Sequence, residues 1–181
     1  MENTCITCHK QGKGCCFFKV ASESQQIGLF LDDIEIIEKH INKNMDYFIE
    51  IDRVSDKFLN DLLSTSYPLF DKIFFRNIRY KLKTIEERCI FLNEDGCELP
   101  IGVRPLFCRV YPFWPSQDFK NIYVLPSSDC LAQEKSTINW EIVNRHFGYS
   151  KNYLNDLFQQ MKEYCENHLT KSGNSNDFVG N

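Results

Sequence analysis

The amino-acid sequence predicts a small α+β domain organised by its cysteines, with a short β-hairpin or sheet and about five helices, two of them C-terminal. Apolar residues recur at helical spacing in some segments and alternate with polar residues, as in strands, in others. Nine cysteines add a third signal, because eight of them fall in predicted loops or at element ends. A chain of 181 residues is most simply one domain. We place this domain at residues 1–170 and expect a disordered tail at 171–181.

The first half of the chain is predicted to hold one loop, a possible strand and three helices. Residues 1–16 are polar and without a period, so we expect a loop shaped by its cysteines, followed by a short strand at 17–20. Apolar residues at helical spacing predict a helix over 31–42. Two further short helices are predicted, the second capped by Ser55: 45–51 and 57–63.

The second half is predicted to alternate strands with loops and to end in two helices. Residues 72–83 suggest a strand with one buried face. The turn Asn93-Glu94-Asp95-Gly96 predicts a hairpin between 89–92 and 97–99, because Asp-Gly tolerates positive φ. A short strand is expected at 122–125, and helices near 133–147 and 152–169. The last helix carries one apolar face: Leu154, Leu157, Phe158, Met161, Cys165 and Leu169.

Charge and hydropathy exclude several classes of partner. The net charge of −4 argues against non-specific binding of nucleic acid, which needs a basic face. No segment approaches the ~18 consecutive apolar residues of a membrane span, and the first residues show no secretory leader. We therefore expect a cytoplasmic protein that binds neither nucleic acid nor a membrane. In a reducing cytosol, clustered cysteines are metal ligands, catalytic thiols or small buried residues rather than disulfides.

Eight cysteines are candidate metal ligands: Cys5, Cys8, Cys15, Cys16, Cys89, Cys97, Cys108 and Cys130. The spacing of Cys5 and Cys8 suits chelation of one ion. Thioredoxin-like redox motifs share this spacing, but here it does not open a helix after a strand. The adjacent side chains of Cys15 and Cys16 diverge, so this pair more naturally serves two neighbouring sites than one.

The cysteines of the second block lie near structural signals. Cys89 and Cys97 bracket the predicted hairpin and could reach one end of it. If Pro105 is the first residue of a helix, Cys108 lies near the helix N-terminus, where the dipole lowers the pKa of a thiol.

Three further residues are expected to support the site. Arg104 and Arg109 would offset the charge of about −2 of a four-thiolate Zn²⁺ or [4Fe–4S]²⁺ centre. The alternative for Arg104 is an ordinary surface salt bridge. Tyr111 belongs to an aromatic run that would wall the site, or alternatively grip a substrate.

The remaining cysteine and the histidines are weaker candidates. Cys165 falls on the apolar face of the last helix and is expected to be buried and unreactive. His9 is an alternative ligand beside Cys8, although a solvated loop histidine is the simpler interpretation. The other histidines lie toward helix C-terminal ends, where a basic side chain suits the dipole: His40, His146 and His168.

The second cysteine block resembles a known family. The residues Cys89-Ile90-Phe91-Leu92, Asp95-Gly96-Cys97 and Arg104-Pro105-x-x-Cys108-Arg109-x-Tyr111-Pro112-Phe113 are similar to the signature of the YkgJ-type zinc- or iron-chelating domain. This group is also described as the CxxCxxCC family of iron–sulfur-cluster-containing proteins. The earlier and later cysteines match in order, from Cys5 to Cys130. One departure is the six-residue spacer between Cys8 and Cys15, which is longer than the family usually has.

The resemblance implies eight cysteine ligands for an iron–sulfur cluster, with [4Fe–4S] the expected type, or for Zn²⁺. On this basis we expect a metalloprotein that binds an iron–sulfur cluster, alone or with a second metal. It would serve in electron transfer or as an accessory to a redox enzyme or other protein partner. A zinc-stabilised structural or protein-interaction module is the alternative. Flagellin lysine N-methylases are similar in their cysteine-rich portion, which makes a lysine N-methylase-like enzyme a third reading. Those proteins are much longer, and the residues leave open whether the chain is an enzyme.

Overall fold

The computed structural model describes residues 4–12, 15–18, 28–65, 74, 77–125, 130–133 and 140–174. Within these ranges the chain forms six α-helices and eight short strands, which pair into four two-stranded antiparallel sheets. The predicted α+β class is therefore confirmed. Most of the regular secondary structure is helical, and the eight strands have only two to five residues each.

The helices are α1 (Thr4–Lys10), α2 (Leu31–Ile41), α3 (Asp56–Thr65), α4 (Leu106–Val110), α5 (Trp140–Phe147) and α6 (Lys151–Asn174), with the 3₁₀ turns η2 (Met45–Tyr47) and η5 (Leu131–Gln133). The four strand pairs are β1 (Ile49–Arg53) with β2 (Ile78–Leu82), β3 (Thr84–Ile85) with β4 (Arg88–Cys89), β5 (Leu92–Asn93) with β6 (Gly96–Cys97), and β7 (Phe113–Pro115) with β8 (Ile122–Val124). Each pair is antiparallel.

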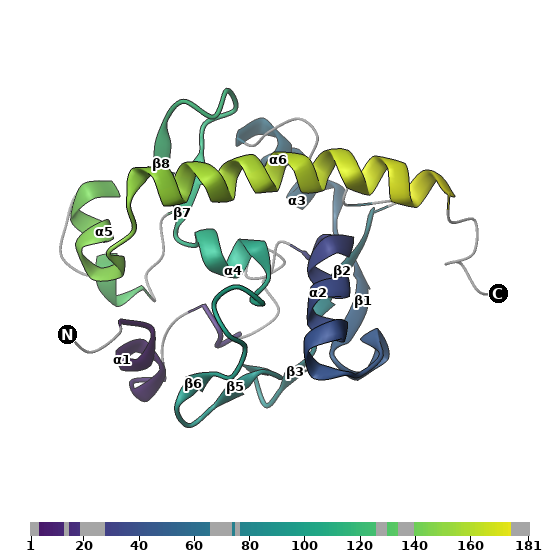
Figure 1. Ribbon diagram of the computed structural model, residues 1–181, viewed down its shortest axis with the longest axis horizontal. Coiled ribbons are helices and arrows are strands. Elements are labelled where there is room, and N and C mark those ends of the chain that lie inside the picture. Colours follow the sequence, from purple (N-terminus) through teal and green to yellow (C-terminus); the bar gives the residue numbers. More distant parts are fainter. Residues whose placement is uncertain are drawn as a thin grey trace.

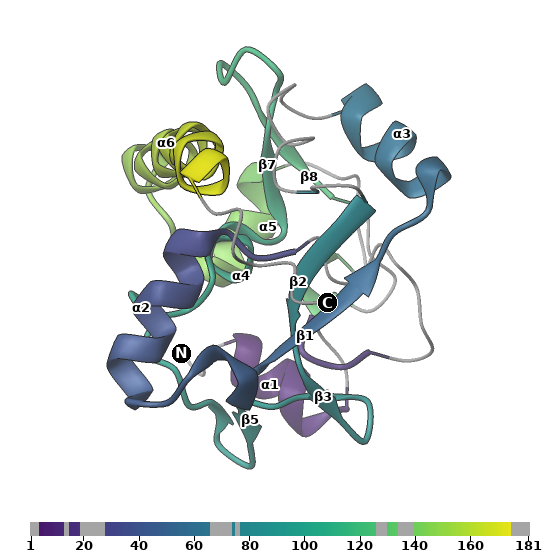
Figure 2. The ribbon, with the colours of Figure 1, turned by 90° about the vertical axis from the view of Figure 1, so that its right-hand side faces the viewer.

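Helix α6 spans most of the length of the molecule and packs over α4 and α2 (Figure 1). The β1–β2 ribbon lies beside α2, and the small β3 and β5 strands lie at the end of the molecule remote from α6 (Figure 2). None of the helices that the structure describes is both long and apolar enough to cross a membrane.

Two clusters of buried side chains hold these elements together. The cluster that we call the helical core joins α4, α5, α6, β7 and β8, and includes Leu106, Val110, Phe113, Leu154 and Phe158. The cluster that we call the hairpin core joins α2, β1, β2 and β4, and includes Ile34, Ile37, Phe48, Leu82 and Phe91. Burial of such large apolar side chains is the main favourable contribution to folding.

Two predicted helices agree closely with the structure. Helix α2 buries Ile34 and Ile37 and ends at Asn42, which adopts the left-handed conformation of a helix C-cap. Helix α3 starts one residue after Ser55, whose Oγ accepts the backbone N–H of Phe58 at 3.1 Å. The predicted cap at Ser55 is therefore confirmed.

Three predictions for the first half were wrong in part. Residues 4–10 form α1 instead of a loop, because this segment packs against β6 and η5. The expected helix at 45–51 is only the η2 turn followed by β1, since pairing of Ile49–Arg53 with β2 satisfies more backbone groups. Of the strand expected at 17–20, Phe17 forms a single bridge with Arg88, and residues 19–20 lie outside the described ranges.

The hairpin prediction was right about the turn and wrong about Cys89. Strands β5 and β6 flank the predicted turn, where Gly96 has a φ of 108°, a value that L side chains rarely adopt. Cys89 belongs instead to the preceding β3–β4 hairpin, paired with Thr84. Of the strand predicted over 72–83, residues 78–82 form β2, and residues 72, 73, 75 and 76 lie outside the described ranges. The strand predicted at 122–125 is β8.

The C-terminal part contains the two expected helices. Helix α5 begins at Trp140, while residues 134–139 lie outside the described ranges. Helix α6 continues to Asn174, so residues 171–174, expected in the tail, belong to the helix, and 175–181 are not described. Its predicted apolar face is buried as far as the structure describes its side chains: Leu154, Leu157, Phe158, Met161 and Cys165.

Candidate metal centre

Seven of the eight candidate cysteines line one pocket of about 170 Å³: Cys8, Cys15, Cys16, Cys89, Cys97, Cys108 and Cys130. They come from segments that are far apart in the sequence, and none of the seven forms a disulfide. The eighth, Cys5, lies in α1, but its side chain is outside those that the structure describes. The lining draws on both the helical and the hairpin core, so the pocket lies where the two cores meet.

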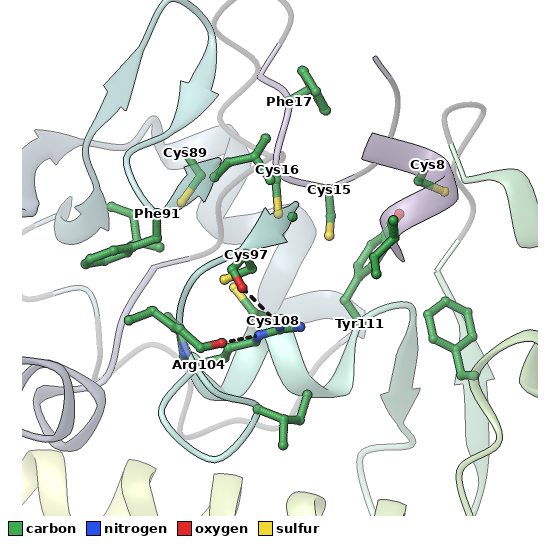
Figure 3. A pocket seen from close by; sticks show the side chains of 18 of the residues that line it. Cys8, Cys15, Cys16, Phe17, Cys89, Phe91, Cys97, Arg104, Cys108 and Tyr111 are labelled. Carbon is green, nitrogen blue, oxygen red and sulfur yellow. Dashed lines mark hydrogen bonds between the residues drawn. The ribbon is translucent and has the colours of Figure 1, made fainter. Parts of the chain in front are cut away.

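The Cys15–Cys16 pair is attached to the hairpins by its backbone. The backbone N–H of Cys89 donates to the carbonyl of Cys16 at 3.0 Å, and the N–H of Phe18 donates to that of Glu87 at 2.7 Å. The chain around Cys16 therefore runs along β4 without forming a regular strand. Figure 3 shows the sulfurs of Cys15, Cys16, Cys97 and Cys108 directed toward a common space.

Arg104 fixes the loop that leads from β6 to α4. Its Nε donates to the carbonyl of Leu99 at 2.9 Å, and its Nη2 donates to the carbonyl of Cys97 at 3.4 Å. The guanidinium also lines the pocket and lowers the pKa of the Cys97 thiol, against the larger raising effect of burial. Among the described residues Arg104 forms no ion pair with a carboxylate, so the alternative of an ordinary salt bridge finds no support.

One face of helix α4 presents Cys108 to the pocket, and the opposite face of the helix is buried in the helical core. Leu106 and Val110 are almost fully buried in the helical core, whereas Cys108 is exposed toward the pocket. The helix begins one residue after Pro105, close to the prediction, and Pro105 provides no side-chain cap. Instead Oδ1 of Asp33, from α2, accepts the backbone N–H of Leu106 at 3.0 Å.

The pKa of the Cys108 thiol is raised, in contrast to the prediction from the helix dipole. Burial is the largest cause, followed by the neighbouring thiols Cys15, Cys89 and Cys97. Although solvent can enter the pocket and reach Cys108, surrounding protein still removes most of its hydration. The dipole of a five-residue helix is too weak to overcome these effects.

Other pocket thiols have raised pKa values for related reasons. Burial raises the pKa of Cys89 to about 12 and also raises that of Cys130. The pKa of Cys15 is raised first by its hydrogen bond with the Cys16 thiol and then by burial, even though Cys15 is exposed toward the pocket. Without a bound cation these thiols are neutral, and a cation among them would favour the thiolate forms.

The other two predicted supporting residues occupy different places. Tyr111 lines the pocket, as expected of a wall residue. Arg109 does not line it and is buried with an exposed fraction of 7%. Its Nε and Nη2 have no hydrogen-bond partner in the part of the chain that the structure describes. Burial raises the pKa of Asp33, and the charge of Arg109 offsets part of that rise. Arg109 therefore acts on α4 and its neighbours from the core rather than on the thiols from the pocket.

Several residues near the site were missed in the sequence. Asp33 was not among the predicted site residues, and nothing in the sequence indicates that it caps α4. Asp95 was assigned to turn chemistry but also lines the pocket. Phe147, the last residue of α5, and Tyr149 also line the pocket. Nothing in the sequence indicates that the end of this helix lies near the thiols.

Three of the residues judged weak candidates lie where the sequence predicted them. Cys165 is fully buried in the helical core, which confirms its predicted burial. His40 and His146 occupy the last turns of α2 and α5, as expected. The side chains of His9 and His168 are outside those described.

The thiols gather without forming a single-ion site. Four thiolates at about 2.3 Å from one zinc ion would hold their sulfurs roughly 3.8 Å apart. Among the described residues, no group of three or more His, Cys, Asp or Glu side chains is arranged to hold one metal ion. The donor set is nevertheless all sulfur, and soft thiolates are the ligands of zinc and of iron–sulfur clusters.

Comparison with known proteins gives little further information. No protein-family model matches the chain, and no solved structure matches it. The chain is similar to an uncharacterized protein of Methanocaldococcus jannaschii, with 24% identity over 103 residues. The match covers 52% of this chain and 36% of that protein, so the chain spans little more than a third of the relative's length.

Proposed function

We propose that the chain is a cytosolic metalloprotein that binds an iron–sulfur cluster in the cysteine pocket. Its role would be electron transfer or service to a partner redox enzyme. The observation that carries this proposal is the convergence of seven predicted ligands on one pocket. If the cysteines served only as small apolar residues, seven of the nine would not be expected to line one cavity.

Two properties of the pocket favour a cluster over a lone zinc ion. Its volume of about 170 Å³ exceeds the space of one ion, and no three or more His, Cys, Asp or Glu side chains among the described residues are arranged to hold one ion. A polynuclear cluster accepts thiolates that lie further apart, because each binds a different metal atom. The positive charge of Arg104, which has no carboxylate partner in the described part of the chain, would stabilise the net negative charge of a four-thiolate cluster.

When bound, the cluster would supply one-electron redox chemistry, and the protein would supply its ligands and surroundings. Cys89, Cys97 and Cys108 would hold it together with the Cys15–Cys16 pair. Arg104 would provide positive charge at the pocket wall. Tyr111 and the apolar residues of the wall, such as Phe91, would limit the access of water. These surroundings are among the features by which proteins set the reduction potential of a cluster.

Anaerobic purification with metal analysis tests the proposal. We expect bound iron and acid-labile sulfide, visible charge-transfer absorption, and loss of both iron and absorption in Cys89→Ser, Cys97→Ser and Cys108→Ser. Cys165→Ala is the matched control, because it removes a buried sulfur outside the pocket, and it should retain the wild-type iron content. A colourless protein with stoichiometric zinc would favour the structural zinc module instead, since the all-thiolate donor set suits zinc equally well.

A further inference from the structure

The net negative charge of the chain is concentrated in one segment. Residues 84–103, which we call the acidic segment, have a net charge of −4, equal to that of the whole chain, so the remaining residues carry equal numbers of acidic and basic side chains. The segment contains one arginine, Arg88, and five carboxylates: Glu86, Glu87, Glu94, Asp95 and Glu98. All five acidic residues are exposed, and none belongs to an ion pair among the described residues. Their charge can therefore act on a partner.

The acidic segment also forms part of the cysteine pocket. It begins at β3, and β3 and β5 lie at the end of the molecule remote from α6 in both views (Figure 1, Figure 2). Eight residues of the segment line the pocket, and two of these, Asp95 and Ile101, are exposed. The exposed fraction of Ile101 is 50%. Since Cys15 and Cys108 are exposed as well, the pocket opens to the surface beside an apolar side chain and a carboxylate.

The arrangement of the carboxylates suits a protein partner better than a metal ion. They occupy the turns of two hairpins and the end of β6, and no three or more of the described His, Cys, Asp or Glu side chains are arranged to hold one ion. A partner protein contacts separated charges at the same time. Protein interfaces combine an apolar centre with a polar rim, which is the arrangement that Ile101 and the carboxylates provide. Complementarity of charge then requires a basic surface on the partner.

We propose that the acidic segment is the docking surface for a one-electron redox protein with a basic face, with Ile101 at the apolar centre of the contact. This inference rests on the proposed iron–sulfur function. In each encounter one electron passes from the reduced cluster to the oxidised centre of the partner, and no bond is formed or broken. The opening is where candidate ligands reach the surface, so a partner docked there comes close to the cluster. Opposite charges on the two surfaces speed the encounter and orient it.

Electron transfer to a basic c-type cytochrome tests the docking surface. The reconstituted protein is reduced with dithionite, freed of excess reductant and mixed anaerobically with the ferric cytochrome in a stopped-flow spectrometer. The same cytochrome with succinylated lysines, whose charge is reversed, is the control. We expect the unmodified cytochrome to react faster, with a rate constant that falls as salt is added, because salt screens the attraction. The rate constant for the succinylated form should rise with salt.

Paired variants locate the surface on the molecule. Glu94→Gln/Glu98→Gln removes two charges from the acidic segment and should lower the rate constant for the basic cytochrome roughly three- to tenfold at low salt. Asp156→Asn/Glu166→Gln changes the net charge equally at exposed positions of α6 and should lower the rate constant less.

A second pair of variants tests the apolar centre. Ile101→Ser should lower the rate constant, whereas Tyr123→Ser, on β8, removes a side chain of similar exposure (56%) and should not. All the substituted positions are exposed, so the variants should fold. Calorimetric binding of the ferric cytochrome to the oxidised protein should rank these variants in the same order.

The outcomes separate the failure of this inference from that of the proposed function. If the folded protein forms no cluster, the proposed function is wrong, and the calorimetric measurement still tests the surface. If a cluster forms but both cytochromes react at the same rate, the docking surface is wrong and the cluster assignment stands. The same conclusion follows if Asp156→Asn/Glu166→Gln lowers the rate constant as much as Glu94→Gln/Glu98→Gln.

Discussion

At the scale of single residues, Arg104 and Arg109 are both cationic and flank Cys108, but their surroundings differ. Arg104 lines the pocket and donates to two backbone carbonyls, whereas Arg109 is buried. Burial raises the pKa values of Asp33 and Tyr164, and the charge of Arg109 offsets part of each rise. A guanidinium can hold two carbonyls in fixed directions while its charge acts on nearby thiolates. Arg104 therefore combines a structural and an electrostatic role, and substitution can separate the two.

Arg104→Gln and Arg104→Lys should have equal effects on stability and unequal effects on metal retention. Both variants lose the forked donation to the carbonyls of Leu99 and Cys97, so each should lower the free energy of unfolding of the metal-free protein by about 1 to 2 kcal/mol. Only the Gln variant also removes the positive charge, and it should retain less iron after desalting. Urea unfolding and iron analysis measure the two effects. Equal iron loss in both variants would indicate that bond geometry, not charge, holds the cluster.

The cysteines of the pocket could be predicted from the sequence, but the residues that hold their segments in place could not. Spacing and turn signals identified the candidate ligands, because clustered thiols outside an apolar helix face are often metal ligands. Asp33 carries no such signal, since an acid in the first turn of a helix is common and needs no distant partner. Its hydrogen bond to Leu106 joins residues 73 positions apart, a distance over which local pattern contains no information.

At the scale of elements, α4 is the piece of secondary structure on which the candidate site depends most. It has only five residues, too few for a helix that is stable by itself. Burial of Leu106 and Phe107 and the cap from Asp33 hold it in place. The carboxyl group of Asp33 is almost fully buried, and burial raises its pKa from 3.8 to about 7. The N–H groups of Leu106 and Phe30 and the charge of Arg109 reduce this shift without cancelling it.

This raised pKa predicts that stability falls as pH rises. The folded state binds the Asp33 proton more tightly than the unfolded state, so its advantage is complete below about pH 4 and is lost as pH rises through about 7. At about 1.4 kcal/mol per unit, the full effect is on the order of 4 kcal/mol. Asp33→Asn keeps an oxygen acceptor for Leu106 and does not titrate. The variant should therefore gain stability relative to wild type between pH 5 and pH 8.

Urea unfolding at several pH values measures this difference. Asp156→Asn is the matched control, because it neutralises an exposed carboxylate on α6 and should change the free energy of unfolding by less than about 0.5 kcal/mol. A constant difference between Asp33→Asn and wild type from pH 5 to pH 8 would show that Asp33 does not titrate in this range in the folded protein.

The elements that the sequence predicted well are those whose own pattern is strong. Helices α2 and α6 each have a periodic apolar face, and the β5–β6 turn contains Asp-Gly. Helix α1 has no such face and depends on contacts with β6 and η5, among them the side chain of Ile6 beside Gly96. Strand β1 was mistaken for helix because its pairing with β2 is a long-range effect that outweighs local preference.

At the scale of the whole molecule, the candidate site lies between a core that contains a long helix and a region built from very short elements. The helical core contains α6, which has 24 residues and a buried apolar face. On the other side of the pocket, β3, β4, β5 and β6 have two residues each, and α1 has seven. Such short elements have few backbone hydrogen bonds of their own. Metal bonds between them and α4 would supply the missing constraint, so that metal binding and local folding are coupled.

Removal of metal should therefore loosen one side of the molecule more than the other. We expect a chelator to speed amide hydrogen exchange in α1 and in the β5–β6 hairpin, while amides in the middle of α6 keep their protection, because local opening follows local contact density. Hydrogen-exchange mass spectrometry of the metal-loaded and metal-free protein makes this comparison within one chain, with α6 as the internal control.

Cys97→Ser, treated in the same way, should already show fast exchange in the hairpin and respond little to the chelator. Equal acceleration in α6 and the hairpin would mean that the metal stabilises the fold as one cooperative unit, and unchanged exchange in both would mean that the cysteine pocket contributes nothing to folding.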